Sequence, residues 1–324
     1  MLTAFIFEND KLPITTTSLD DVRHAARRDD AMLWVDLESP EESLLLQIGE
    51  IFGLDEESMD DCLHGEQRPR LDEFEAYLFL VLYGLFGVER DVELTPRKLA
   101  VFCGERFLIT VHRQPLMTVR QVRERCKRHS DAMLREGLDA VLFALIDLTV
   151  DHYMDVADQY ETRVEDLEDR SFQEGVDESL LSDAADVRRE LLELRRLATS
   201  QRQLLLPVAQ GHYDYISDRL SLRFRHVRDH LAEVRDTIDS LRELLVGVRD
   251  NYHAMLADRT NEIVKTLTIY AGILLPLSVI TGIYGMNVPL WPAPNQKWTF
   301  WFVVGCMMAV STGLFWYFRR KRWM

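Results

Sequence analysis

The chain has 324 residues, of which 47% are hydrophobic and 28% are charged, and its formal net charge is -16 at pH 7. This excess of carboxylates argues against nucleic acid as a partner, because phosphate binding needs concentrated Lys and Arg. No catalytic motif is present, so we expect neither an enzyme nor a bound cofactor. The cysteines show no CxxC spacing and no His at ligand spacing, which argues against a zinc finger or a disulfide framework: Cys62, Cys103, Cys126 and Cys306.

The charge is unevenly distributed along the chain. No Asp or Glu follows Glu262, whereas five basic residues follow residue 265: Lys297, Arg319, Arg320, Lys321 and Arg322. This asymmetry separates an acidic soluble part from a basic membrane end. The N-terminal apolar run has no basic segment before it, which is not typical of a cleaved signal peptide. We therefore expect the acidic part to stay in the cytoplasm.

Residues 1–130 are predicted to form a cytoplasmic α/β domain. Leu44–Phe52 has helical periodicity. Short apolar runs bounded by charged and turn residues predict strands at Ala4–Phe7, Leu33–Leu37, Leu78–Phe86, Leu99–Cys103 and Phe107–Val111. Beyond these runs the strand signals stop, and residues 131–216 are predicted to be a helical region. Its expected breaks are near Gly175 and around Pro207–Gly211.

Residues 217–265 are predicted to form a stalk helix. Apolar side chains from Leu220 to Met255 recur at alternating steps of four and three, which predicts coiled-coil-like packing. Because no helix breaker separates this segment from the membrane span, we expect one helix from about Ser217 to Met286. At ~1.5 Å per residue its length is on the order of 100 Å. The apolar stripe packs against another chain, against earlier helices of its own chain, or against both.

Two charge-free stretches predict membrane spans: Thr266–Val288 has 23 residues and Trp298–Phe318 has 21. Each meets the roughly 20 residues that a hydrocarbon core needs. The spans are assigned to residues 266–288 and 298–318, the outer loop to 289–297 and a basic tail to 319–324. The short loop makes the pair a helical hairpin. The positive-inside rule places both termini in the cytoplasm of a protein of the inner (plasma) membrane.

Two membrane helices cannot enclose a path for water, so a pore needs several chains around an axis in the lipid bilayer. One face of the first span carries small, weakly polar or aliphatic side chains at steps of three or four: Asn261, Val264, Thr268, Ala271, Leu275, Ser278 and Gly282. A hydrated divalent ion can pass such a surface, and aliphatic rings can gate it by dewetting. Because small residues also mark helix interfaces in membranes, this pattern leaves pore lining and helix packing equally open.

Asn287, which follows Gly285 and Met286, is the candidate selectivity residue at the outer end of the first span. Its side-chain carbonyl is a neutral acceptor for hydrogen bonds from water. Because Mg²⁺ dehydrates reluctantly, a ring of such acceptors can select the ion with its water shell intact, whereas a carboxylate ring would bind it too firmly. By itself, an Asn after Gly-Met is also typical of a helix C-cap.

Several longer motifs add to the Gly-Met-Asn signal. They are Trp34-Val35-Asp36-Leu37, Gln67-Arg68-Pro69-Arg70-Leu71, Phe107–His112, Asn261–Thr268 and Thr281–Asn287. Together they resemble the CorA family of divalent metal-ion transporters along the whole chain. The resemblance implies a homopentamer with a funnel of α/β/α domains and Asn287 as the filter at its mouth. It also implies a basic cuff at the cytoplasmic membrane surface, formed by Lys265, Arg319, Arg320, Lys321 and Arg322.

The outer loop departs from the magnesium branch of that family. That branch follows its Asn with a Met-Pro-Glu segment, whereas Val288–Lys297 contains no carboxylate and one lysine, so attraction of cations to the mouth is expected to be weaker. Zinc-transporting relatives also lack this acid. Three functions therefore stay open: transport of Mg²⁺ (or Co²⁺ and Ni²⁺), proton-linked transport of Zn²⁺, and a non-conducting scaffold that regulates another membrane protein.

Regulatory metal sites are also implied by the resemblance, because divalent ions in the family bind between cytoplasmic domains and hold the pore shut. Asp147, Asp151 and Asp155 recur at every fourth residue along one helix face, and carboxylates suit a hard cation. His226 and His230 are one helical turn apart, a spacing that suits Zn²⁺ or Ni²⁺. The alternative for both groups is a solvated helix face with arginine partners.

Overall fold

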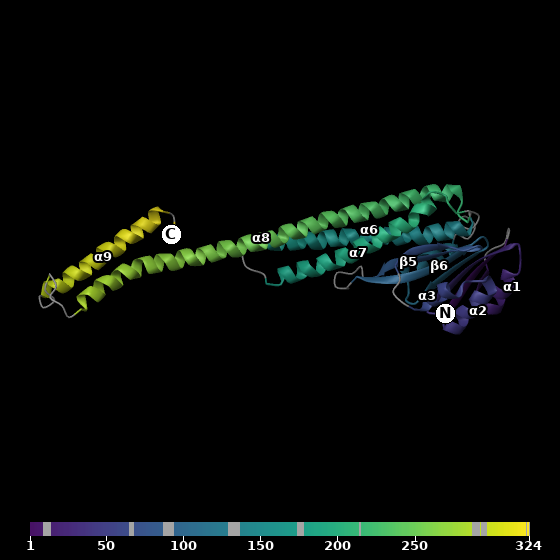
Figure 1. Cartoon of the computed structure of the whole chain (residues 1–324), viewed down its shortest axis with the longest axis horizontal. Helices are drawn as coiled ribbons and strands as arrows, with labels where there is room; N and C mark the ends of the chain where they lie inside the picture. The colour runs from purple at the N-terminus through teal and green to yellow at the C-terminus, as the bar shows by residue number, and fades with distance from the viewer. Residues whose placement is uncertain are drawn as a thin grey trace. The chain divides into compact units, whose positions relative to one another are not determined.

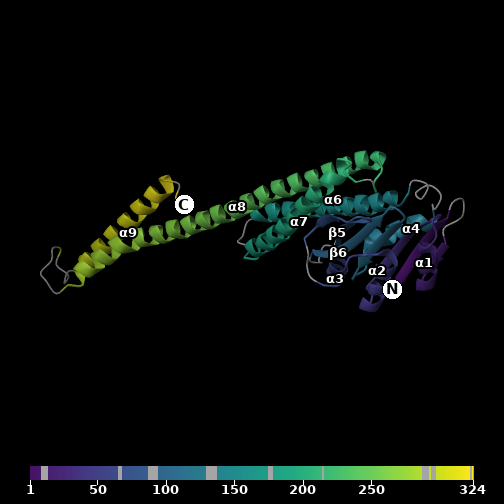
Figure 2. The ribbon, with the colours of Figure 1, turned by 45° about the vertical axis from the view of Figure 1, so that its right-hand side comes forward.

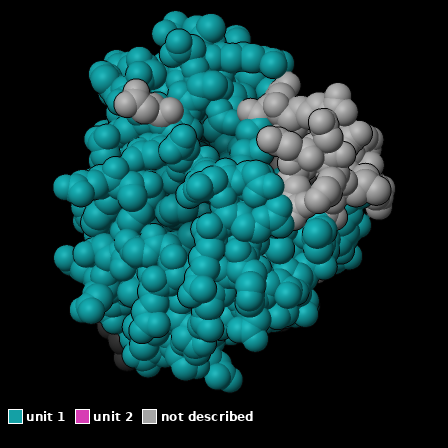
Figure 3. Space-filling view, turned by 90° about the vertical axis from the view of Figure 1, so that its right-hand side faces the viewer, with its two compact units in different colours: residues 1–170, 178–248 teal, residues 171–177, 249–324 magenta. Residues whose placement is uncertain are grey.

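The computed structural model describes residues 1–8, 14–64, 68–86, 94–128, 137–173, 178–213, 215–286, 292, 297–321 and 323. Figure 1 traces the chain. It divides into two compact units, which are described separately below. Unit 1 comprises Met1–Arg170 and Glu178–Val248 and is drawn in teal in Figure 3. Unit 2 comprises Ser171–Asp177 and Arg249–Met324.

Unit 1 is built on a seven-stranded sheet. In chain order its strands are β1 (Leu2–Glu8), β2 (Ile14–Thr16), β3 (Ala31–Glu38), β4 (Arg70–Glu73), β5 (Tyr77–Phe86), β6 (Thr95–Gly104) and β7 (Phe107–His112). Across the sheet they follow the order β2-β1-β3-β7-β6-β5-β4. Neighbours run antiparallel except β3 and β7, whose parallel register sets Asp36 beside Thr110.

Helices cover both faces of this sheet, which gives unit 1 three layers (Figures 1 and 2). One face carries α1 (Leu19–Ala26), α2 (Glu42–Phe52) and α3 (Glu56–Leu63), and the other carries α4 (Met117–Arg128), α6 (Leu138–Ser171) and α7 (Leu180–Ala209). Because strands buried on both faces need apolar side chains throughout, the central strands appear in the sequence as continuous apolar runs. All five predicted strands and the predicted helix at α2 are confirmed.

The edge strands β2 and β4 were not predicted from the sequence. Their residues are exposed or half-buried, so neither strand contains an apolar run. Short polar edges of this kind protect a sheet from pairing with other chains. Of the two expected breaks in the helical region, Gly175 lies outside the described residues, between the end of α6 at Ser171 and the start of α7 at Leu180. The second is where it was expected: α7 runs through Pro207 for two further residues and ends before Gly211, whose φ is +72°.

The stalk forms one continuous helix, α8 (Asp218–Tyr284), which confirms the expected long helix. Within unit 1 its apolar stripe from Leu220 to Val248 is at most 5% exposed. The ring of Phe224 meets that of Phe143 of α6 at a centroid distance of 5.2 Å, and Asp239 accepts a 2.7 Å hydrogen bond from Arg195 Nε of α7. Coiled-coil-like packing is thus confirmed, and within unit 1 the stripe packs against helices of its own chain.

Candidate ion pathway and metal sites

The predicted pore-lining side chains share one exposed face of α8 in unit 2. Val264 is 54% exposed and Leu275 is 66% exposed, which is high for aliphatic side chains. All seven are exposed: Asn261, Val264, Thr268, Ala271, Leu275, Ser278 and Gly282. The residues that precede Tyr284 in α8 therefore keep a continuous uncovered stripe, which is called the lining face below.

A neighbouring side of α8, around Ile269 and Gly272, is covered by the second membrane helix, α9 (Lys297–Arg320). Ile269 is 6% exposed and Phe318 of α9 is 9% exposed. A Cβ atom on Gly272 would lie only 3.1 Å from Phe318 Cζ, so a glycine is what lets the two helices approach this closely. Helix packing inside the chain thus uses Gly272 and leaves the lining face open.

Two hydroxyl groups on the lining face have a defined orientation. Thr268 Oγ1 donates to the carbonyl oxygen of Val264 at 2.7 Å, and Ser278 Oγ donates to that of Leu274 at 3.0 Å. Each hydroxyl proton is therefore used within the helix, while the lone pairs of each oxygen stay available. Such oxygens act as acceptors, which suits contact with the protons of an ion's water shell.

The C-terminal end of α8 closes in a tight turn. Gly285 N donates to the Thr281 carbonyl at 2.9 Å, and a Cβ atom at Gly285 would lie 3.2 Å from that oxygen. Glycine therefore fits this turn without displacing the backbone. Met286 follows and is 56% exposed. Asn287 lies outside the described residues, as do most of residues 289–297, so the filter assignment stays a prediction.

The basic end of α9 brings together most of the predicted cuff. Arg319, Arg320 and Lys321 are exposed and directly follow Phe318, whereas Lys265 of α8 is half-buried about two helical turns before Gly272. Because Phe318 and Gly272 are neighbours, these cations share one end of the helical hairpin. Arg322 lies outside the described residues.

The predicted regulatory residues do not form a metal site within one chain. Among the described residues, no group of three or more His, Cys, Asp or Glu is placed to hold a metal ion. On α6, Asp147 is half-buried and Asp151 and Asp155 are exposed; on α8, His226 is exposed and His230 is half-buried.

The surroundings of Asp147 differ from those of a cation site. Burial and neighbouring Asp151 raise the pKa of Asp147, and Arg223, His230 and Arg125 oppose that rise. Arginines close to this carboxylate match the solvated-face alternative. A metal site that includes these residues stays a prediction, and it needs ligands from a second chain.

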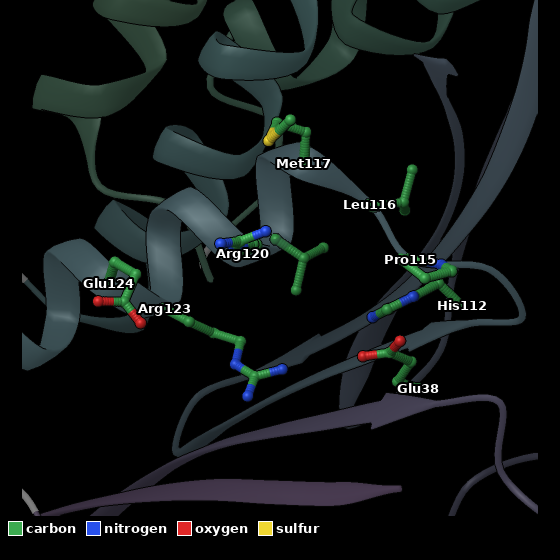
Figure 4. Close-up of a pocket in the computed structure, with 9 residues that line it drawn as sticks. Glu38, His112, Pro115, Leu116, Met117, Arg120, Arg123 and Glu124 are labelled. Atoms are coloured by element: carbon green, nitrogen blue, oxygen red, sulfur yellow. The ribbon is translucent and has the colours of Figure 1, made fainter. Parts of the chain in front are cut away.

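Sequence reasoning missed a buried charged network, two members of which, His112 and Arg123, line a cleft of about 430 Å³ (Figure 4). Asp36 is 1% exposed; it accepts a 2.6 Å hydrogen bond from Thr110 Oγ1 and a 3.1 Å one from Arg123 of α4. His112 Nε2 lies 3.3 Å from Asp36 Oδ1, and His112 Nδ1 donates to the Gln114 carbonyl at 2.8 Å. The network joins β3, β7 and α4. A carboxylate inside an apolar strand run was the signal that could have revealed it.

This network predicts a pH-dependent contribution to stability. Burial by itself lowers the pKa of His112, but Asp36, the Gln114 carbonyl and Glu38 outweigh it and raise that pKa above its ordinary 6.5. The imidazolium therefore stabilises the folded state below pH 6.5, and this contribution disappears as the pH rises through the folded-state pKa. We expect urea unfolding to show the largest difference between wild type and His112→Gln near pH 6, shrinking towards pH 9. A difference that grows with pH would contradict the proposed ion pair.

Comparison with known proteins identifies the family. The sequence model of the "CorA-like Mg2+ transporter protein" family matches residues 29–320. The chain belongs to the CorA family. The cobalt/magnesium transport protein CorA of Thermotoga maritima is 28% identical over 90% of this chain and 83% of that protein. The zinc transport protein ZntB of Pectobacterium carotovorum is 22% identical over 83% of this chain and 81% of that protein.

The fold of this CorA-family chain also matches a solved structure over its whole length. The complete CorA magnesium transporter from Methanocaldococcus jannaschii superimposes with a TM-score of 0.87 over 99% of this chain and 98% of the other, at 19% identity. By length and composition, α8 and Trp298–Arg320 of α9 can each cross a membrane. The protein is therefore a membrane metal-ion transporter of the CorA family with two transmembrane helices and a long coiled-coil-like stalk.

Proposed function

We propose that this CorA-family protein is a channel for hydrated divalent cations, Mg²⁺ first, formed by a homopentamer in the inner membrane. The observation that carries the proposal is the lining face of α8, which stays uncovered although α9 packs against the same helix at Gly272. In lipid, water needs a closed path. Several copies of α8 that turn this face towards a common axis provide one, with α9 on the outside.

The chemistry of the lining face suits passage rather than binding. It carries no charge, so a divalent ion meets no site that holds it tightly. The oxygens of Thr268 and Ser278 accept hydrogen bonds from water in the ion's shell, because their own protons are used within the helix. Between and below them, rings of Leu275 and Val264 provide apolar constrictions that close the pore when they dewet.

Selection is assigned to a ring of Asn287 side chains at the outer mouth. An amide oxygen accepts hydrogen bonds from water without the charge that would trap the ion, and Mg²⁺ normally keeps several waters when proteins bind it. The positive-inside rule supports cytoplasmic termini, since Arg319, Arg320 and Lys321 follow α9 and Lys265 precedes the first span. Unit 1 then lies in the cytoplasm.

Zinc transport is the second candidate, and a specific feature favours it. The segment Val288–Lys297 lacks the carboxylate that the magnesium branch has at this place, and zinc-transporting relatives lack it too. The mouth therefore attracts cations less strongly than an acidic one would. Among the relatives of this chain is a zinc transport protein, ZntB. In this version the flux is of Zn²⁺ and is coupled to protons.

Ion flux measured on purified full-length protein in liposomes tests the proposal. Mg²⁺, Co²⁺, Ni²⁺ and Zn²⁺ are compared one at a time, with and without a pH gradient, against liposomes that contain no protein. We expect Mg²⁺ uptake that does not depend on the pH gradient. Zn²⁺ flux driven by the gradient would favour the second candidate. If no ion gives a flux and another membrane protein co-purifies, the non-conducting scaffold is favoured. That result would overturn both the Mg²⁺ channel and the Zn²⁺ transporter.

A further inference from the structure

The charged end of α9 combines three cations with an aromatic surface. The guanidinium of Arg320 lies over the ring of Trp316 at 5.4 Å, and the ammonium of Lys321 lies over the ring of Tyr317 at 5.6 Å. Both pairs are four residues apart, so adjacent ridges of one helical turn each hold a cation on an aromatic face. Each cation is therefore held close to the helix surface.

Trp323 extends this aromatic surface beyond the helix. Its backbone N–H donates to the Phe318 carbonyl at 3.1 Å, and its ring stacks on that of Phe318 at 5.9 Å with an interplanar angle of 22°. Trp and Tyr are enriched at the boundary between the hydrocarbon core and the lipid headgroups. The aromatic side chains at the C-terminal end of α9 therefore suit a position at this boundary.

The cations at this end have no acidic counterpart nearby in the sequence. No Asp or Glu follows Glu262. Among the residues that the structure describes, Arg319, Arg320 and Lys321 form no ion pair with a carboxylate, although all three are exposed. Their positive charge is therefore available to an anion from outside the chain.

The position of α9 indicates which anion this is. If the lining face of α8 surrounds the pore, then α9, which packs on α8 at Gly272 and leaves the lining face uncovered, lies at the periphery. Trp316 is 62% exposed and Tyr317 is 49% exposed in unit 2. At the periphery of a membrane assembly these side chains meet lipid. The anions at that depth are the phosphate groups of phospholipids.

We propose that Arg319, Arg320 and Lys321, with the rings of Trp316, Tyr317 and Trp323, form a binding site for the headgroup of an anionic phospholipid. The inference rests on the proposed function only for placing α9 at the periphery. Guanidinium groups bind phosphate oxygens through paired N–H donors, and the ammonium adds a point charge. The aromatic rings cover the glycerol region and the upper acyl chain.

The test measures lipid binding to purified full-length protein by native mass spectrometry. The probes are phosphatidylglycerol and phosphatidylcholine with identical acyl chains. The variant is Arg320→Gln/Lys321→Gln. The matched control is Arg235→Gln/Arg249→Gln, which removes two cations from α8 well before its membrane span. Each surface cation contributes roughly fivefold to binding of an anionic membrane. We expect phosphatidylglycerol binding to fall on the order of twentyfold in the variant and to stay unchanged in the control.

Three outcomes would overturn the site: equal binding of the two lipids to wild type, unchanged phosphatidylglycerol binding in Arg320→Gln/Lys321→Gln, or the same loss in the control variant. Displacement of phosphatidylglycerol by an equal concentration of soluble glycerol phosphate would also overturn it, because the membrane depth of the rings would then play no part. The measurement is independent of ion flux. A protein that conducts no ion yet shows this lipid preference would overturn the proposed function and keep the lipid site.

Discussion

Replacing Asn287 by alanine is expected to reduce Mg²⁺ flux at least tenfold while the protein still assembles and inserts. In the proposed pore, each chain offers one amide oxygen to the ion's water shell. A hydrogen bond of this kind contributes about 1 kcal/mol, and the loss of two at one step already lowers the rate by more than tenfold. Uptake into liposomes by a fluorescent Mg²⁺ indicator measures the effect, and size-exclusion chromatography reports assembly.

The outer loop supplies a matched control for this substitution. Asn295 is an asparagine a few residues beyond Asn287 and outside the signature motif. We expect Asn295→Ala to conduct like wild type. The filter assignment is wrong if Asn287→Ala conducts normally, or if both alanine variants lose flux to the same extent.

Replacing Phe224 by alanine is expected to destabilise unit 1 by about 3–5 kcal/mol, the usual cost of deleting a buried phenyl ring. Phe224 is 0% exposed, and its ring meets that of Phe143 edge-on at an interplanar angle of 71°. Arg223 places its guanidinium 4.1 Å from the centroid of the Phe143 ring. The cavity would therefore open where α8 meets α6. Urea unfolding of the full chain, followed by circular dichroism, measures the loss.

Leu222 is the control on the same helical turn. Its side chain is 56% exposed, so Leu222→Ala is expected to change the free energy of unfolding by less than about 0.5 kcal/mol. Similar losses for the two variants would show that the stripe of α8 is not the buried face. This comparison also tests whether the stripe packs within its own chain. If it packed only against a second chain, Phe224→Ala would leave the free energy of unfolding of a single chain nearly unchanged.

Much of the fold could be predicted from the sequence because burial sets the pattern of side chains. The central strands are apolar throughout because helices cover both faces of the sheet. The apolar repeat of α8 reflects its packing against α6 and α7. What covers that stripe could not be predicted. Leu231 and Ile238 need an apolar neighbour, and the same spacing serves a helix of the same chain or of another.

The network of Asp36, Thr110 and His112 was hidden for a related reason. Its members are separated in sequence and meet only because β3 and β7 are parallel neighbours. No local pattern reports a parallel register between strands so far apart. By contrast, the residues of the lining face of α8 could be grouped from the sequence, because they recur on one side of a single helix, and the structure leaves that side exposed. That this side lines a pore stays a prediction.

Cross-linking of adjacent leucines in α8 tests the central arrangement most directly. Leu275 lies on the lining face, and Leu274, which is 58% exposed, is rotated by about 100° around the helix at nearly the same depth. In a Cys306→Ala background, mild oxidation of membranes is predicted to join chains through Leu275→Cys and to leave Leu274→Cys uncross-linked. Equal cross-linking at the two positions, or cross-linking through Leu274→Cys alone, would contradict a pore lined by this face.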